Sequence, residues 1–77
     1  MEIKEFIDNF IDQFDDEPET ELTRDTVFRD LDGWSSIVAL SVMAMVDEEY
    51  EVQLKADEMR SANTIGELYD IVESHLG

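Results

Sequence analysis

The chain has 77 residues and a formal net charge of −16, with 21 acidic residues, five lysines and arginines, and no cysteine. This length predicts a single domain, residues 1–77, with a thin core. The charge argues against nucleic acids and anionic membranes as partners, since both need a basic surface, and favours partners with basic patches. Without cysteine there is no disulfide, thiolate metal site or cysteine nucleophile.

The sequence also indicates the cellular location of the protein. Residues 1–5 lack the basic flank and apolar core of a signal peptide. The longest apolar run, residues 37–46, is too short to span a bilayer. The absence of cysteine fits a reducing compartment. We therefore expect a cytoplasmic protein with no stable membrane association.

The first element is a helix predicted over residues 3–14. Its apolar side chains recur at the i, i+3, i+4, i+7 spacing of one helical face. They are Ile3, Phe6, Ile7, Phe10, Ile11 and Phe14. We interpret this stripe as core and not as a cofactor site. Pro18 and the acidic residues around it then oppose continuation of the helix.

Residues 15–35 are expected to form one long loop, which is unusual in a compact domain unless it is anchored or functional. The apolar residues that would anchor it are Leu22, Val27, Phe28 and Leu31. A short turn is favoured over residues 23–26. We interpret the acidic residues 15–21 as a solvated loop and not as a metal site.

The most apolar segment is a helix predicted to begin at the serine pair Ser35-Ser36 and to end at Glu49 or Tyr50. Almost no polar face remains along it. In so small a domain this helix cannot be buried on all sides. Part of it should be exposed apolar surface, which usually marks a binding site.

The turn before this helix carries the candidate functional residue. Gly33 permits the turn, and Trp34 is expected to pin the loop to the body of the domain. Ser35 and Ser36 are both good N-cap candidates. A phosphodiester on a hydroxyl here would lie where backbone N–H groups and the helix dipole favour negative charge. One hypothesis is a serine modified by another protein; the alternative is two serines that only cap the helix.

The rest of the chain predicts a link and two helices. Residues 52–54 form a short extended link, and residues 56–61 form one or two helical turns with Met59 facing inward. Thr64 opens a capping box at the start of a last amphipathic helix that runs to about His75. The apolar face of that helix comprises Ile65, Leu68, Tyr69, Val72 and Leu76. The predicted fold class is all-α, a small bundle of three main helices and one short helix with a long first loop.

Enzyme and calcium-sensor chemistries do not fit these residues. A hydrolase nucleophile elbow needs Gly-x-Ser-x-Gly, and the stretch from Gly33 lacks the second glycine. The only histidine, His75, is interpreted as a cation at a helix end and not as a catalytic base. A calcium loop with Gly33 at its sixth position would put Phe28 first and Ala39 last, where ligands are required. We expect neither catalytic residues nor a metal site.

A family resemblance rests on the run Phe28-Arg29-Asp30-Leu31-Asp32-Gly33-Trp34-Ser35-Ser36-Ile37 and on the aromatic Tyr50 that ends the following helix. With the size, acidity and helix order of the whole chain, these features resemble the acyl and peptidyl carrier proteins. That family attaches 4′-phosphopantetheine to a serine that opens its second helix, typically in Asp-Ser-Leu. Counted back from Tyr50 by the family's usual helix length, the resemblance puts the arm on Ser36, with Ile37 in the leucine position.

The resemblance implies a carrier that is not itself an enzyme. A phosphopantetheinyl transferase would modify Ser36 from coenzyme A with Mg²⁺. The thiol of the arm would then carry an acyl or aminoacyl group as a thioester. The expected role is to carry acyl intermediates for fatty acid biosynthesis or for related polyketide, lipid or specialised biosynthesis. The carrier would be a monomer.

Partner enzymes with basic patches would dock on the second helix. Helical spacing puts one set of residues on the expected docking face: Ile37, Leu40, Ser41, Ala44, Asp47 and Glu48. The other face, expected toward the core, comprises Ala39, Val42, Met43, Val46 and Tyr50.

Three positions depart from the family pattern. Ser35 stands where the family usually has aspartate, and Val38 and Ser41 occupy positions that are often acidic. A carrier dedicated to one pathway is therefore an alternative to a carrier of general fatty acid synthesis. The competing class of function is a non-carrier acidic helical module for protein interaction. A covalent phosphopantetheine adduct on a serine peptide would decide for the carrier.

Overall fold

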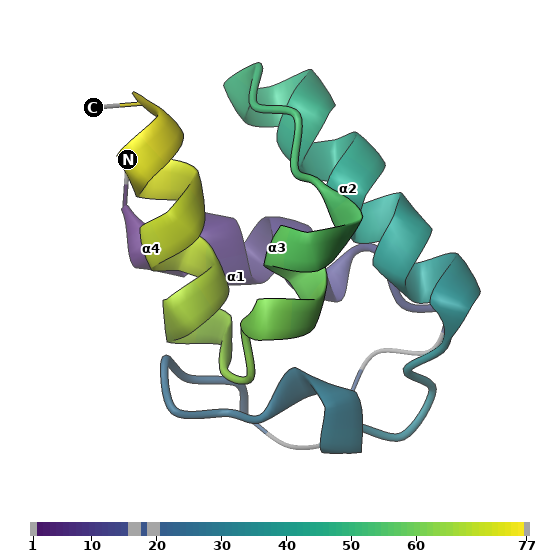
Figure 1. Cartoon of the computed structure of the whole chain (residues 1–77). Coiled ribbons are helices and arrows are strands. Elements are labelled where there is room, and N and C mark those ends of the chain that lie inside the picture. The colour runs from purple at the N-terminus through teal and green to yellow at the C-terminus, as the bar shows by residue number, and fades with distance from the viewer. Residues whose placement is uncertain (1, 16–17, 19–20, 77) are drawn as a thin grey trace.

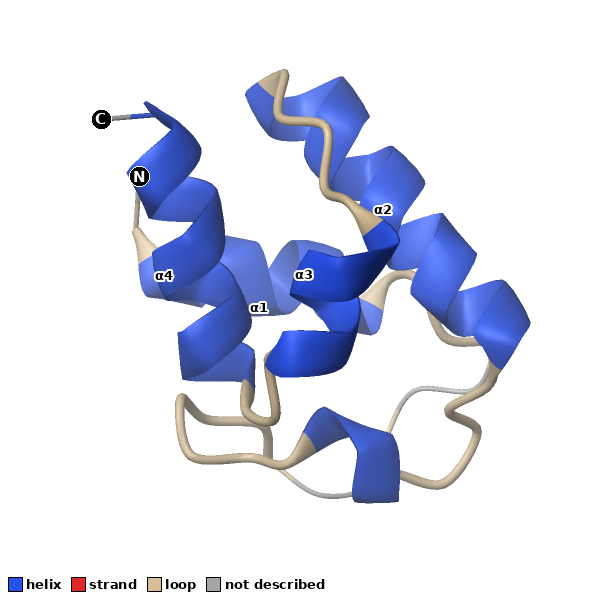
Figure 2. Ribbon diagram, viewed as in Figure 1, coloured by secondary structure: helices blue, strands red, loops and turns tan. Residues whose placement is uncertain are grey.

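The computed structural model of the chain describes residues 2–15, 18 and 21–76. Within these ranges it contains α1 (Ile3–Ile11), a 3-10 turn η1 (Phe28–Asp30), α2 (Ser36–Tyr50), α3 (Ala56–Ser61) and α4 (Ile65–Leu76) (Figure 2). α1 contacts both α2 and α4, and α3 contacts α4. Figure 1 shows α1 crossing behind α4 and α3, with the long first loop running below them to the start of α2. The predicted all-α bundle is confirmed.

α1 supplies the aromatic part of the core. Phe6 and Phe10 are fully buried, as the periodicity predicts. The helix itself ends at Ile11, three residues earlier than predicted, and Asp12 is its C-cap. A carboxylate at a helix C-terminus opposes the helix dipole, which disfavours further turns. Phe14 still reaches the core, because a turn follows in which its N–H donates to the Ile11 carbonyl at 3.0 Å.

The first loop is anchored as expected, with one difference. Leu22 and Phe28 are buried, and Leu31 packs partly buried against the core. Val27 is instead 40% exposed, and it holds the loop through its backbone, in an antiparallel bridge with Thr64. The predicted turn over residues 23–26 is present. Of the acidic segment, residues 16–17 and 19–20 lie outside the described residues.

The loop is strapped to the start of α4 by main-chain hydrogen bonds. The N–H of Ile65 donates to the Thr26 carbonyl at 3.0 Å, and the N–H of Gly66 donates to the Arg24 carbonyl at 2.9 Å. A Cβ at Gly66 would lie 3.0 Å from that same carbonyl oxygen, so any larger residue would push the Arg24 backbone away from α4. The Arg24 guanidinium also bonds Asp70 of α4 at 2.9 Å.

The short helix α3 is held by side chains from two other elements. Arg29 of η1 donates to the carbonyls of Met59 and Arg60, at the C-terminal end of α3. These carbonyls have no partner within the helix. His75 of α4 lies 2.7 Å from Glu58. Because six residues cannot form a stable helix alone, these contacts and the buried side chain of Met59 keep α3 in place.

α4 begins as predicted and ends more exposed than predicted. Thr64 and Glu67 form the expected capping box, with the N–H of Glu67 donating to the Thr64 hydroxyl at 3.1 Å. The predicted apolar residues of its first two turns are buried. Leu76, which the pattern placed on the same face, is the last residue of α4 and is 50% exposed.

The carboxyl group of Glu58 gives a testable pH dependence. Its pKa lies below the usual range, first because the N–H of Lys55 donates to it and then because of the contact with His75. Such a group stabilises the fold above its unfolded pKa of 4.5, and this stabilisation is lost as the pH falls through the lower folded pKa. Glu58→Gln should therefore cost less than about 1 kcal/mol of unfolding free energy near neutral pH.

Urea unfolding of both forms between about pH 7 and pH 3 measures this difference. The difference should be fully present above pH 4.5, shrink as the pH falls below 4.5, and vanish once the pH lies below the lower folded pKa of Glu58. A difference that is the same at every pH would contradict the assignment.

The net charge predicts a salt-dependent stability. Among the described residues only two ion pairs of arginine offset the excess of carboxylates, Arg24–Asp70 and Arg60–Asp57, and the His75–Glu58 contact adds a third only when His75 is protonated. Screening should relieve the remaining repulsion. Relief of about 1 kcal/mol would raise Tm by about 4–8 °C in a domain of this size. Divalent cations should raise Tm more than monovalent salt of equal ionic strength, and a Tm unchanged from low to moderate salt would contradict this account.

Candidate functional site

The candidate site lies where the first loop ends and α2 begins. Ser35 is the N-cap of α2, with extended backbone angles of φ −153° and ψ 172°. Its hydroxyl oxygen accepts a hydrogen bond from the N–H of Val38 at 3.3 Å. Its carbonyl accepts the N–H of Ala39 at 2.9 Å. The side chain of Ser35 therefore satisfies one of the free N–H groups at the helix start.

Ser36 is the first residue of α2 and has a different environment. Its side chain is exposed, and its hydroxyl makes no hydrogen bond with any described residue. A phosphodiester on this hydroxyl would lie beside the free N–H groups of the first turn, which favour negative charge. The site therefore has both the accessibility and the electrostatics that a phosphate-linked group needs.

The turn before these serines is fixed by an aromatic side chain. Trp34 is half-buried, and its ring centroid lies 4.9 Å from that of Phe28 and 6.0 Å from that of Phe10. Gly33 has φ +89°, a conformation that favours glycine. The expectation that Trp34 pins the loop to the body of the domain is confirmed.

The expected docking residues of α2 fall on one exposed surface. Ile37 and Leu40 are 76% and 65% exposed, so neither belongs to the core. Ala44, Asp47 and Glu48 are also exposed. Ser41 is the exception, since it is half-buried at the edge of this surface. The apolar part of the surface lies next to Ser36 and the acidic part lies at the far end of the helix.

The opposite face of α2 packs on the core. Val42 and Val46 are fully buried. Ala39, Met43 and Tyr50 are partly buried against the core. The Tyr50 hydroxyl accepts a hydrogen bond from the Asn9 side chain at 3.0 Å and so links α2 to α1. Burial raises the pKa of this hydroxyl.

Two buried residues of α2 were not assigned to the core from sequence. They are Val38 and Met45, which are 7% and 5% exposed. Together with Val42 and Val46 they follow a spacing of four, three and one residues, which is a helical stripe. Nearly every neighbouring position is also apolar, so this stripe has too little contrast in the sequence for the spacing to assign Val38 and Met45 to the core.

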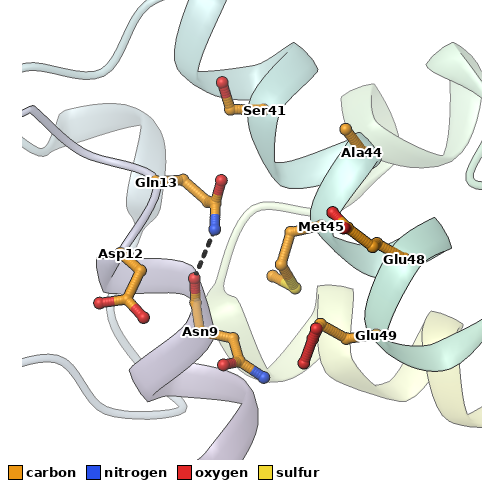
Figure 3. A pocket seen from close by; sticks show the side chains of 8 residues that line it. All are labelled: Asn9, Asp12, Gln13, Ser41, Ala44, Met45, Glu48 and Glu49. Atoms are coloured by element: carbon orange, nitrogen blue, oxygen red, sulfur yellow. Dashed lines mark hydrogen bonds between the residues drawn. The ribbon is translucent and has the colours of Figure 1, made fainter.

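A groove of about 410 Å³ separates the end of α1 from α2 (Figure 3). It is lined by Asn9, Asp12, Gln13, Ser41, Ala44, Met45, Glu48 and Glu49. Most of these side chains are polar, and that of Gln13 donates to the Asn9 carbonyl at 3.0 Å. Such a lining suits water and basic groups better than an acyl chain, which needs apolar walls. Ser41, Ala44 and Glu48 of the expected docking face form one side of it.

Two further features of the described residues bear on other functions. No group of three or more histidines and carboxylates in the described part of the chain is arranged to hold a metal ion. Over the same residues, no helix has the length and apolar content needed to cross a membrane.

Comparison with known families identifies the class of protein. The family described as "Phosphopantetheine attachment site" matches residues 6–72, from α1 into α4. The chain belongs to this family of carriers. Neither a curated protein nor a solved structure matches it. As a member, the chain is a carrier without catalytic activity of its own, and its cofactor is covalently attached 4′-phosphopantetheine.

The residues at the start of α2 fit this group. Phosphopantetheine is linked through a phosphodiester, and Ser36 offers an exposed primary hydroxyl beside free helix N–H groups. When attached, the group supplies a flexible arm that ends in a thiol, the reactive atom that this cysteine-free chain lacks. The family match therefore decides against the non-carrier interaction module that the sequence left open.

Proposed function

We propose that Ser36 is the attachment residue and that the chain carries acyl intermediates as thioesters on its arm. The observation that carries this proposal is that the hydroxyl groups of two adjacent serines have different environments. The Ser35 hydroxyl is engaged in capping α2, at 3.3 Å from the N–H of Val38. The Ser36 hydroxyl is exposed and has no described partner. A transferase can reach the second without breaking a cap.

The pathway we propose is fatty acid biosynthesis or a related polyketide, lipid or specialised pathway served by its own partner enzymes. The surface beside Ser36 supports a dedicated carrier. Ile37 and Leu40 make it apolar, while Val38 is buried and Ser41 half-buried, so the first two turns of α2 offer no carboxylate. An enzyme that recognises this end of α2 would need an apolar contact more than a basic one. In this proposal the carrier acts as a cytoplasmic monomer.

The carried group can be read directly by intact-mass spectrometry of the protein isolated from its native cells. The proposal expects one phosphopantetheine per chain, with an acyl group on part of the population. An acyl mass that hydroxylamine releases supports thioester carriage and identifies the acyl class. An aminoacyl mass would contradict the acyl assignment, and a chain with no adduct, even after treatment with coenzyme A and a transferase, would contradict the carrier proposal.

The docking surface that we propose on α2 comprises Ile37, Leu40, Ser41, Ala44, Asp47 and Glu48. The acidic part of this surface should control the association rate, and the apolar part should control the dissociation rate. Reversing the charges of Asp47 and Glu48 to lysine should mainly slow association with the transferase and flatten its salt dependence. Leu40→Ala should mainly speed dissociation, because buried apolar anchors control residence time. Stopped-flow binding measures both rates.

Two controls accompany the docking experiment. Glu5→Lys with Asp8→Lys on the exposed face of α1 changes the net charge equally from another helix, and should affect association less. A thermal melt of each variant checks the fold. If Leu40→Ala cost several kcal/mol of stability, as a core truncation does, its 65% exposure would not describe the protein in solution and the docking surface would be wrong.

A further inference from the structure

Four aromatic rings from distant parts of the chain meet under the attachment turn. The Trp34 ring lies nearly parallel to that of Phe10, with an interplanar angle of 5°, and its centroid is 6.2 Å from that of Phe14. Its nearest ring, Phe28, belongs to η1 and lies at 4.9 Å. Phe10 and Phe28 are fully buried. A single half-exposed ring therefore ties the turn to α1, to the turn after α1 and to η1.

The backbone transmits this attachment to Ser36. The N–H of Trp34 donates to the Leu31 carbonyl at 3.1 Å. The next residue, Ser35, caps α2 through both its hydroxyl and its carbonyl. Ser36 and Ile37 are exposed and do not hold the helix start down, so the first buried side chain of α2 is that of Val38. The ring of Trp34 is thus the main anchor on the N-terminal side of the modified residue.

We propose that Trp34 is a positioning residue for the modification of Ser36. It does not touch the reacting atoms. It keeps the cap and the first turn of α2 formed in the free protein, so that a transferase meets the Ser36 hydroxyl at a preformed helix start. This inference rests on the proposed attachment at Ser36.

The expected kinetic effect follows from the cost of ordering the turn. A helix end without its anchor opens locally, well below the free energy of global unfolding. When only a fraction of the free protein has the binding-competent turn, the apparent affinity falls by that fraction. Once bound to the transferase, the variant presents the same formed turn as the parent protein. Loss of the Trp34 ring should therefore raise KM and leave kcat nearly unchanged. A general loss of stability should not raise KM in this way, as long as the protein stays folded.

The test is steady-state modification of the apo protein by a transferase with coenzyme A and Mg²⁺. Trp34→Ala should raise KM about tenfold, with kcat within about twofold of the parent, if the competent turn is populated about a tenth of the time. Trp34→Phe keeps an aromatic ring against Phe28 and should restore most of the affinity. Amide hydrogen exchange gives a readout without the enzyme. The amides of Val38 and Ala39 should lose protection in Trp34→Ala, while that of Glu51 at the far end of α2 should not.

Val72→Ala is the matched control. Val72 is fully buried in α4 and is not one of the rings that contact Trp34, so its truncation should lower global stability while KM stays at the parent value. If Trp34→Ala does not fold by circular dichroism, Trp34→Leu replaces it, because leucine keeps apolar bulk but no ring.

Three outcomes are decisive. An unchanged KM and unchanged exchange in the folded Trp34 variant would overturn the inference. An equal rise of KM in Val72→Ala would overturn it as well. Labelling that persists in Ser36→Ala would instead overturn the proposed attachment site, so the two failures are distinguishable.

Discussion

Ser36→Ala is expected to abolish attachment of 4′-phosphopantetheine completely, whereas Ser35→Ala should still be modified. Alanine at position 36 removes the only exposed, unengaged hydroxyl at the start of α2. Alanine at position 35 removes the cap on the Val38 N–H, which costs about 0.5–2 kcal/mol of stability. The measurement is the intact mass of each variant after incubation with coenzyme A, Mg²⁺ and a broad-specificity transferase.

The double variant is the control for this experiment, since it must remain unmodified whichever serine is used. Circular dichroism at the assay temperature should find all three variants helical, because neither hydroxyl contributes to the core. Full labelling of Ser36→Ala together with loss of labelling in Ser35→Ala would assign the arm to the other serine. The capping bond would then have to break on modification.

Phe10→Ala is expected to have the largest effect on folding. Phe10 is fully buried, and its ring contacts those of Phe6, Phe14, Phe28 and Trp34 at centroid distances of 5.7 to 6.4 Å. Truncating such a side chain costs about 3–5 kcal/mol through lost burial and the cavity left behind. Small domains have only about 5 kcal/mol to lose. Much of the variant should therefore be unfolded at ambient temperature.

Ile37→Ala is the matched control for Phe10→Ala. It truncates another large apolar side chain, but one that is 76% exposed, so its effect should be within about 0.5 kcal/mol. Urea unfolding followed by far-UV circular dichroism measures both. Similar losses for the two variants would mean that α2 packs differently from the arrangement described, with Ile37 inside the core.

Hydrophobic periodicity predicted the elements well where polar and apolar positions contrast. In α1 the apolar stripe alternates with acidic residues, so Phe6 and Phe10 could be placed in the core from sequence. The end of α1 could not be predicted from sequence, because Phe14 continues the apolar spacing although it lies beyond the last helical residue, Ile11. Hydrophobic periodicity indicates which side chains are buried. It does not indicate where the helical backbone ends.

In α2 the same method identified the helix and only part of its faces. Nearly every position from Ile37 to Val46 is apolar, so the pattern has little directional information. The exposed positions Ile37 and Leu40 could be inferred from helical spacing relative to the serine. Val38 and Met45 could not be assigned to the core without the packing of α1 against α2.

Contacts between distant residues could not be predicted from local pattern. Arg29 lies 30 residues before the Met59 carbonyl that it bonds, and His75 lies 17 residues after Glu58. A basic residue in an acidic chain has many possible partners, and only the folded arrangement selects one. His75, interpreted from sequence as a cation at a helix end, is also the link between α4 and α3.

The sequence pattern alone predicted that the candidate site lies at the start of the second helix. It did not predict which of the two serine hydroxyls is modified. Two adjacent serines at a helix start are both possible caps. The resemblance to carrier proteins favoured Ser36, and the folded geometry adds an independent reason, since the Ser35 hydroxyl is committed to the Val38 N–H. The family match over residues 6–72 establishes the carrier and does not choose the serine.

The most direct test of the central proposal is tandem mass spectrometry of proteolytic peptides from the unmutated protein, after modification with coenzyme A and a transferase. The two serines are adjacent, so fragment ions that separate them are needed. The account predicts that every fragment containing Ser36 but not Ser35 carries phosphopantetheine, and that fragments ending at Ser35 carry none. Phosphopantetheine on Ser35, on a residue outside this turn, or on no peptide at all would contradict it.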